Sequence, residues 1–456
     1  MEKEDISCSK KIDVKLLILL TIPIFIELIL QLLAGNVDKV MVSDDNLATA
    51  INQANTILDL LVVSLSVLSA ASLVLINQYK GAGDKIREAQ VYKLSFYFNL
   101  FIGIIISIIL VSLAWPFLKA LQVSDEVLPS AVLYLRITGS AVFLQAMMLS
   151  LASYLRSNDM MIKSMIVSIV FNVVNIGLNA LFLYVLLPND KIVAVALGSV
   201  ISRVVGAFLL LLMVIFKLKL DLKLKGLFPL KVSELKKIIM LGIPSAGESF
   251  SYSMSQIVIL ALINLIGSKT VGFESYAPAA KTYASMIVMF TYLFVSAISQ
   301  GMQILLGRYL GAGNKELANK LVWKTTIISL VVNEIFAVVI ALISHKIFGL
   351  LTSDKEVIDL AVKIMFVEIY LEFGRAINIV MVRALQTAGD VLFPTICAIV
   401  SCWIVATLGS FIFGYVFKFG LVGVWFSMAT DEFIRCIIFL FRWHGGKWKN
   451  KNLVKN

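Results

Sequence analysis

The chain has few charged residues for its length. Of its 456 residues only 15% are charged, 59% are hydrophobic, and the mean hydropathy is +0.93. A soluble domain typically has about 25% charged residues, which cover its surface. These values therefore exclude an ordinary soluble protein and indicate an integral membrane protein.

Cysteine and histidine are also scarce, and this excludes several kinds of site. The cysteines have neither the spacing of metal ligands nor an extracellular disulfide pattern, so we expect them to be reduced and structural. They are Cys8, Cys397, Cys402 and Cys436. His345 and His444 lie at the ends of apolar runs, where neither suggests a metal ligand or a catalytic base. No nucleophile or metal constellation appears, so we expect neither an enzyme nor a cofactor.

Acidic residues are fewer than basic ones, and the formal charge is +11. The basic residues do not form a nucleic-acid motif, so we expect no nucleic-acid partner. They lie in alternate loops instead, with seven lysines between residues 217 and 237, whereas the other loops carry mostly acids. This pattern predicts a multi-pass protein of the cell (cytoplasmic) membrane with both termini in the cytoplasm. In the tail, lysines beside Trp443 and Trp448 suit an anchor at an anionic inner leaflet.

Long apolar runs dominate the rest of the chain. A run of about 20 residues crosses a bilayer as a helix, and the first run is too long for a signal peptide. The runs predict an all-α integral membrane protein with twelve transmembrane helices. These lie near 16–42, 52–77, 94–114, 128–152, 162–187, 192–216, 238–266, 273–306, 322–344, 357–384, 393–417 and 420–442.

An internal repeat organises these helices into two halves. Tyr79–Lys85 recurs as Tyr309–Lys315, with five of seven residues identical and an offset of 230. The same offset relates Val127 to Val357 and Leu155 to Leu385. Six crossings return the chain to the side that it left, so the halves form parallel repeats, as in alternating-access transporters. We expect a cytoplasmic N-terminus at 1–15, an N-lobe at 16–216, a cytoplasmic linker at 217–237, a C-lobe at 238–442 and a basic cytoplasmic tail at 443–456.

The first helix carries an unusual polar stripe. Glu27, Gln31 and Asp38 lie within about 40° of one another on a helix. A carboxylate at mid-bilayer costs at least about 2.5 to 3.5 kcal/mol, so it should face protein or water. The spacing from Pro23 to Glu27 recurs in the second half, which favours an architectural role for Glu27. Ile259 stands at the place that corresponds to Asp38, so Asp38 is the stronger functional candidate.

The fifth helix presents a second polar face. Its members are Ser168, Asn172, Asn175 and Asn179, and the sixth helix adds Ser199 and Ser202. Together with Asp38, such oxygens suit a monovalent cation, or the carboxylate takes up a proton. Asn and Ser also bond between membrane helices without any further role. We favour that structural role for Ser168 and Ser202, and a functional role for Asp38, Asn175 and Asn179.

The tenth helix carries a third polar face. Its members are Glu368, Glu372, Arg375 and Asn378. Glu372 and Arg375 are three residues apart, so an internal ion pair is possible. Such a pair either lowers the cost of burial or belongs to a binding site, and the sequence leaves this open. Asp431 and Arg435 are four apart, which favours a structural pair.

Together these residues resemble the multidrug and toxic compound extrusion (MATE) family of transporters, prokaryotic type. The resemblance covers nearly the whole chain. It rests on Pro23–Glu27, Gly35–Val42, Gln78–Asp84, Gly242–Glu248, Arg308–Asn314 and Arg383–Asp390. It implies two six-helix lobes around a central cleft. It also implies export of bulky, often cationic organic compounds, driven by protons or sodium ions.

The resemblance also implies site residues. Prokaryotic members build an ion site in the first lobe from an Asp on helix one, an Asn and an Asp on helix five and a Thr on helix six. By local pattern the matching residues are Asp38, Asn175, Asn179 and Ser199. Asn179 departs from the family's Asp and leaves Asp38 as the only acid of this set. Tyr252 stands where some members have a Glu on helix seven, and Glu372 lies about where some have an acid on helix ten.

The leading hypothesis is an antiporter that exchanges a small organic substrate, cationic or amphipathic, for protons or sodium ions by alternating access. For substrate binding we consider Gln31, Glu248, Tyr252, Glu372, Arg375 and Asn378. We expect a monomer in the lipid bilayer, with no metal beyond a sodium ion at the coupling site. The alternative is a flippase for lipid-linked saccharides of the same superfamily, which would need a more cationic cleft.

Overall fold

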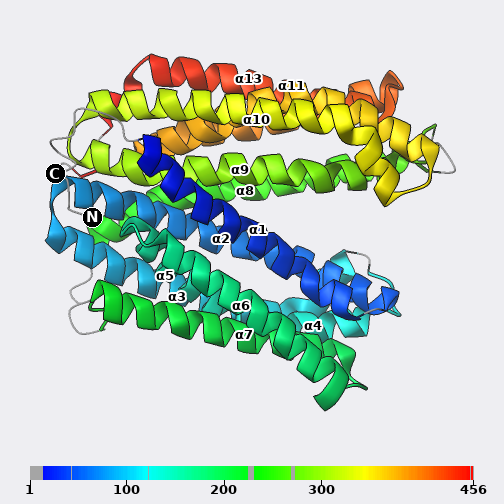
Figure 1. The fold of residues 1–456 in the computed structure, drawn as a ribbon, viewed down its shortest axis with the longest axis horizontal. Helices are drawn as coiled ribbons and strands as arrows, with labels where there is room; N and C mark the ends of the chain where they lie inside the picture. Colours follow the sequence, from blue (N-terminus) through cyan, green and yellow to red (C-terminus); the bar gives the residue numbers. More distant parts are fainter. Residues whose placement is uncertain are drawn as a thin grey trace. The chain divides into compact units, whose positions relative to one another are not determined.

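The computed structural model describes residues 14–42, 44–121, 123–223, 231–268, 273–451 and 453–454. Most of the expected N-terminal segment with Cys8, the linker residues 224–230 and the last two residues of the tail lie outside the described residues. The described chain consists of long helices joined by short connections, and it contains no β-strand (Figure 1).

The chain divides into two compact units. The first unit is Ile22–Ala246, and the second unit is Gly247–Asn456 together with the residues up to Thr21. In chain order α1 (Val14–Val42) begins in the second unit and continues in the first. The first unit then has α2 (Asp45–Ala82), α3 (Lys85–Ala120), α4 (Leu128–Ser140), α5 (Val142–Ser157), α6 (Met161–Leu181), η1 (Phe182–Leu186), α7 (Lys191–Met213) and η2 (Val214–Leu218).

The second half begins with α8 (Val232–Ile266), whose residues up to Ala246 belong to the first unit. The second unit continues with α9 (Ala277–Gly311), α10 (Lys315–Leu351), α11 (Lys355–Thr387), α12 (Leu392–Ser401), η3 (Cys402–Leu408), η4 (Ser410–Val416), α13 (Gly420–His444) and η5 (Lys447–Asn450). Each predicted apolar run coincides with one helix or with two or three consecutive helical segments. Most of the helices extend beyond the apolar run because polar turns at their ends continue the hydrogen-bond ladder.

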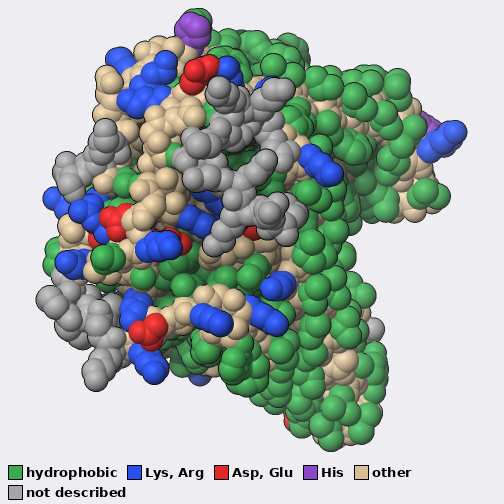
Figure 2. All heavy atoms as spheres, turned by 60° about the vertical axis from the view of Figure 1, so that its left-hand side comes forward, with side chains coloured by type: hydrophobic (Ala, Val, Ile, Leu, Met, Phe, Trp, Pro, Cys, Tyr) green, Lys and Arg blue, Asp and Glu red, His purple; other side chains and the backbone are tan. Residues whose placement is uncertain are grey.

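Among the described residues, nine helices are long and apolar enough to cross a membrane, and the bent pair α4 and α5 makes a tenth. The two remaining expected spans are α11 and α13. Both carry buried charged residues, which lowers their hydropathy. Figure 2 shows Lys and Arg side chains gathered over helix ends and hydrophobic side chains along the helices, the distribution expected of membrane spans.

The repeated glycine motif forms the same turn in both units. Gly83, after α2, has a φ of 73°, and Gly313, after α9, has a φ of 76°. Only glycine adopts this conformation without strain. The next residue caps the following helix, because Asp84 accepts a hydrogen bond from the Arg87 amide and Asn314 from the Leu317 amide. In each unit the motif therefore ends one helix and begins the next.

The span predicted at 128–152 is broken at Ala141, where α4 and α5 meet at 45°. The amide of Phe143 donates to the Ser107 hydroxyl of α3 at 3.1 Å. A side chain from a neighbouring helix thus replaces a carbonyl of the helix ladder, which is a recognised cause of sharp kinks. The hydropathy pattern does not contain this information.

The first turns of α8 dock onto the end of α2 within the first unit. The Tyr79 hydroxyl donates to Glu234 at 2.6 Å, and the Lys237 ammonium donates to the Tyr79 oxygen at 2.8 Å. Tyr79 and Glu234 are both buried. The tyrosine of the repeated motif therefore ties the helix that follows the linker to the first repeat.

Glu27 is held in a buried ion pair. Its carboxylate lies 2.8 Å from the Arg156 guanidinium at the end of α5, and it also accepts from Ser164 of α6. The Glu27 side chain is 3% exposed. This pairing ties α1 to α5 and α6 and agrees with an architectural role for Glu27.

We predict that Glu27→Gln lowers the free energy of unfolding by about 3 to 5 kcal/mol, because it removes the charge of a buried carboxylate that is paired with Arg156. The measurement is unfolding of the purified protein in detergent micelles. Glu316→Gln is the control, since it removes an exposed pair with Lys320 that should contribute only about 0 to 1 kcal/mol. Equal effects of the two substitutions would contradict the structural role of Glu27.

The described part of the tail folds back onto the second unit. Trp443 and Trp448 stack with ring centroids 4.1 Å apart, and each is 1% exposed. The expected role of these tryptophans as interfacial anchors is therefore wrong, because buried rings cannot contact lipid. The loop residue Asp390 accepts from Arg442 at 2.8 Å and lies 3.2 Å from the Lys451 ammonium.

Burial of Asp390 alone would favour its neutral form, but hydrogen bonds and charge from Arg442 and Lys451 outweigh this and lower its pKa. A carboxyl with a lowered pKa stabilises the folded protein above its unfolded pKa of about 3.9, and this stabilisation is lost as the pH falls through the folded pKa. We predict that Asp390→Asn costs about 1 to 3 kcal/mol at pH 7.

The measurement is the difference in thermal unfolding between the parent and Asp390→Asn. This difference should be largest near neutral pH and shrink below about pH 4. Asp354→Asn is the matched control, because Asp354 caps α11 and an asparagine caps a helix equally well. A difference that stays constant with pH would show that the charge of Asp390 has no part in holding the tail.

Candidate functional site

Asp38 lies at a junction of four helices in the first unit. Its Oδ1 accepts from the Asn179 amide of α6 at 2.7 Å. Its Oδ2 accepts from the Ser199 hydroxyl of α7 at 2.7 Å and from the Tyr134 hydroxyl of α4 at 2.6 Å. Asp38 itself is on α1 and is 4% exposed. Three donors thus converge on one buried carboxylate.

Asp38 differs from Glu27 in the nature of its partners. Within the described residues, Asp38 makes no ion pair, whereas Glu27 is paired with Arg156. Three hydrogen bonds stabilise an ionised carboxylate, but they do not neutralise its charge. A buried carboxylate without a basic partner is the kind of group that can gain or lose a cation.

A second layer of side chains supports this arrangement. The Asn175 amide donates to the Ser199 hydroxyl at 3.2 Å and to the Ser202 hydroxyl at 3.4 Å. Ser199 therefore accepts from Asn175 while it donates to Asp38, so the hydrogen bonds run in one direction towards the carboxylate. The structure brings together all four residues of the expected ion set, and Ser202 supports them.

Gly198 leaves room for the Asn179 side chain. A Cβ atom at Gly198 would lie 2.0 Å from Asn179 Oδ1, which is far inside a van der Waals contact. Asn179 Oδ1 is also a buried acceptor that has no hydrogen-bond partner in the described part of the chain. The amide at Asn179 thus offers a donor to Asp38 and keeps an unused acceptor beside it.

Tyr134 was not among the residues expected from the sequence. A single tyrosine in an apolar span gives no periodic signal. Comparison of the two repeats does single it out, however, because the residue 230 positions later is Ile364. A hydroxyl in one half thus corresponds to an aliphatic residue in the other, as Asp38 corresponds to Ile259.

A second polar cluster lies inside the second unit. Glu372 on α11 accepts from Thr291 of α9 at 2.8 Å and from Asn333 of α10 at 2.6 Å, and it pairs with Arg375. Arg375 also lies 3.1 Å from Glu368. The ion pair considered for Glu372 and Arg375 is present, with Glu368 as a third member. These three partners of Glu372 all lie on helices of the second unit.

The other expected substrate residues are more scattered. Asn378 donates to Glu432 of α13, and Arg435 pairs with both Glu432 and Asp431. The structural pair expected between Asp431 and Arg435 is therefore present. The remaining three expected residues are not brought together by any described contact: Glu248 accepts from Thr395, Tyr252 is 43% exposed, and Gln31 is an exposed residue of the first unit.

The described residues form neither a metal centre nor a disulfide. In these parts of the chain no group of three or more His, Cys, Asp or Glu side chains is placed to hold a metal ion. Cys397, Cys402 and Cys436 have free thiols. The oxygens of Asp38, Asn179, Ser199 and Tyr134 converge in the first unit and are of the kind that binds a monovalent cation.

Comparisons with known proteins give a consistent result. The family model described as MatE matches residues 23–181 and 244–412. The chain is 33% identical over 439 residues to the "Uncharacterized transporter YisQ" of Bacillus subtilis (strain 168), with 95% of each chain covered. It is 27% identical over 445 residues to a "Probable multidrug resistance protein NorM" of Thermotoga maritima, with 96% of this chain and 94% of that protein covered.

Among solved structures, the fold matches one described as the outward-facing conformation of a multidrug resistance MATE family transporter of the MOP superfamily. The TM-score is 0.88 at 19% sequence identity, and the match covers 100% of both chains. This confirms the expected all-α, multi-span membrane fold with twelve helices. The two segments matched by the family model begin at Pro23 and Pro244, the prolines inside the first helix of each repeat. The chain therefore belongs to the MATE family of transporters.

Proposed function

We propose that this protein is an antiporter that exports small organic compounds, cationic or amphipathic, in exchange for protons or sodium ions. The observation that carries the proposal is the Asp38 carboxylate, which is buried, accepts three hydrogen bonds and has no ion pair within the described residues. The names of multidrug relatives support the organic substrate.

Cation binding at Asp38 requires its partners to rearrange. A proton on Asp38 would convert one acceptor oxygen into a donor, and that oxygen already faces a donor from Asn179, Ser199 or Tyr134. The hydroxyls could rotate, and the Asn179 amide could turn its unused Oδ1 towards the carboxyl. A sodium ion would likewise need these oxygens to face inward. Either cation therefore changes the contacts between α1 and the helices α4, α6 and α7.

This rearrangement offers a physical basis for coupling. If substrate binds best when Asp38 holds no cation, the cation must weaken substrate binding by the same factor as substrate weakens cation binding. Release outside and reloading inside then follow from the cation gradient. In this scheme the protein functions as a monomer with both termini in the cytoplasm, where the lysine-rich linker also lies.

The alternative is a flippase for lipid-linked saccharides, whose anionic substrate would need basic groups. In the second unit, the charged side chains of the Glu372 and Glu432 clusters, taken together with Glu248, are five acids and two arginines. The acids are Glu248, Glu368, Glu372, Asp431 and Glu432, and the arginines are Arg375 and Arg435. An excess of acids favours a cationic substrate over an anionic one.

We predict that Asp38→Asn reduces cation-driven efflux by at least an order of magnitude while substrate still binds, because the exchangeable charge is lost. The measurement is efflux of a fluorescent organic cation from proteoliposomes, with a pH gradient and a sodium gradient imposed in separate experiments. Asp44→Asn is the matched control, since Asp44 is an exposed cap of α2 and asparagine retains this function. Equal transport by Asp38→Asn and the parent, or no efflux under either gradient, would refute the antiport proposal.

A second prediction concerns Asn179. Asn179→Asp places a carboxylate where an amide now lies 2.7 Å from Asp38. Two carboxylates this close cannot both remain ionised, so the pair should hold a proton at higher pH than Asp38 alone. The pH of half-maximal transport should therefore rise, and it is measured in the same proteoliposomes. Asn172→Asp is the control on the same helix, and an unchanged pH profile in Asn179→Asp would exclude Asn179 from the ion site.

A further inference from the structure

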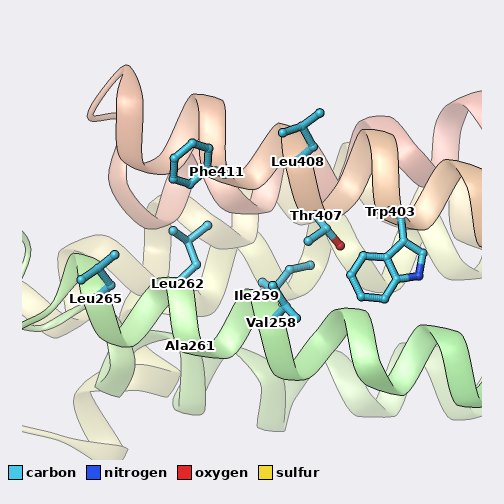
Figure 3. A pocket seen from close by; sticks show the side chains of 9 residues that line it. All are labelled: Val258, Ile259, Ala261, Leu262, Leu265, Trp403, Thr407, Leu408 and Phe411. Atoms are coloured by element: carbon cyan, nitrogen blue, oxygen red, sulfur yellow. The ribbon is translucent and has the colours of Figure 1, made fainter.

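An apolar groove opens between α8 and the η3–η4 segment, entirely within the second unit (Figure 3). Its volume is about 500 Å³, and nine side chains line it. Ile259 and Leu262 line one wall, and Trp403, Leu408 and Phe411 line the other. Ligand cavities in proteins commonly have volumes of about 300 to 1,000 Å³, so the groove is large enough for a ligand.

The groove lies between the two elements of the second repeat that correspond to α1 and α6, and one of its lining residues is the counterpart of Asp38. In the first unit, α1 meets α6 through Asp38 and Asn179; in the second, α8 meets η3 through Ser255 and Thr407, whose hydroxyls are 2.7 Å apart. The spacing from Pro23 to Asp38 equals that from Pro244 to Ile259. Ile259 lines the groove.

The residues of the second repeat that correspond to the other members of the Asp38 site have no polar side chains. The offset of 230 holds up to α6 and α12, because Asp159 and Gly389 both have positive φ, of 57° and 87°. With this offset Tyr134, Asn175, Asn179 and Ser199 correspond to Ile364, Val405, Gly409 and Ala429. Ile259, Ile364 and Ala429 belong to one apolar cluster. Five polar side chains are thus replaced by aliphatic residues and a glycine.

The polar atoms that remain in the groove are already bonded. The Thr407 hydroxyl contacts Ser255 and donates to the Cys402 carbonyl at 3.0 Å. The Trp403 indole donates to Ser251 at 2.9 Å. These are the two polar side-chain atoms among the nine lining residues. The lining therefore provides no counter-charge for an organic cation, which would lose its hydration on entry.

The backbone that forms one wall is unusual. η3 and η4 are two consecutive π-helical segments, Cys402–Leu408 and Ser410–Val416, separated only by Gly409. π-Helical turns are rare and occur frequently at functional sites. In the first repeat, the corresponding α6 remains α-helical through Leu181, and a single π-helical segment follows it. The wide π-helical wall is thus specific to the half that has the groove.

We propose that this groove binds an acyl chain of a membrane lipid. The groove is continuous with exposed apolar side chains on both of its helical walls. Ile257 and Leu260 of α8 are 45% and 40% exposed, and Ile404 of η3 is 59% exposed. On membrane spans such surfaces are solvated by hydrocarbon, so an acyl chain reaches the groove without crossing a polar barrier. This proposal does not depend on cation coupling at Asp38.

Trp403 provides a direct probe because it lines the groove. The full-length protein is reconstituted in phosphatidylglycerol bilayers that contain a rising fraction of lipid with brominated acyl chains, which quench tryptophan fluorescence on contact. The Trp403 signal is the difference between the parent and Trp403→Phe. Trp115 of α3, which is 46% exposed, provides a reference for ordinary contact with lipid through Trp115→Phe.

We expect quenching of Trp403 to saturate at a lower fraction of brominated lipid than quenching of Trp115. Ala261→Phe and Leu408→Phe fill the groove and should abolish the saturable part of the Trp403 quenching. If one of these variants fails to fold, the other is sufficient for the test. Leu260→Phe, on the same helix but outside the lining, should leave it unchanged. Three results would overturn the proposal. Quenching of Trp403 could follow the bulk lipid fraction, it could persist in both filled variants, or it could be relieved by an organic cation.

Discussion

An ionised side chain in a hydrocarbon layer must find partners, and this requirement determines where the polar residues of this chain lie. Ion pairs form between Glu27 and Arg156, between Glu372 and Arg375, and between Asp431 and Arg435. These pairs join helices that have no loop in common or stabilise one turn of a single helix. Asp38 is satisfied differently, by three neutral donors. The contrast separates carboxylates that are held in ion pairs from one that is held by neutral groups.

The duplication makes this contrast sharper. The two repeats share their turns and a proline inside the first helix of each, but they place polar groups at different positions. The second-unit residues Thr291, Asn333 and Glu372 correspond, at an offset of 230, to Leu61, Gly103 and Val142 of the first unit. Conversely, the residues that correspond to the Asp38 site in the second repeat are aliphatic residues and a glycine. One scaffold has thus acquired a different internal chemistry in each half.

The sequence was sufficient to predict the helices, because hydropathy and loop charge depend on local composition. It was also sufficient to assemble Asp38, Asn175, Asn179 and Ser199, because helical periodicity and the family resemblance indicate the same residues. The kink at Ala141 was not predictable, since it depends on Ser107 of another helix. The burial of Trp443 and Trp448 was also missed, because hydropathy cannot distinguish a ring that faces lipid from one that stacks on its neighbour.

The close approach of Gly198 to Asn179 links two positions that are 19 residues apart in the sequence. Because a Cβ atom at 198 would overlap the Asn179 amide oxygen, a side chain at 198 is compatible only with a smaller or reoriented side chain at 179. The two positions should therefore vary together among related transporters. The chemistry of one hydrogen-bond partner of the carboxylate is thus restricted by a residue that has no functional group of its own.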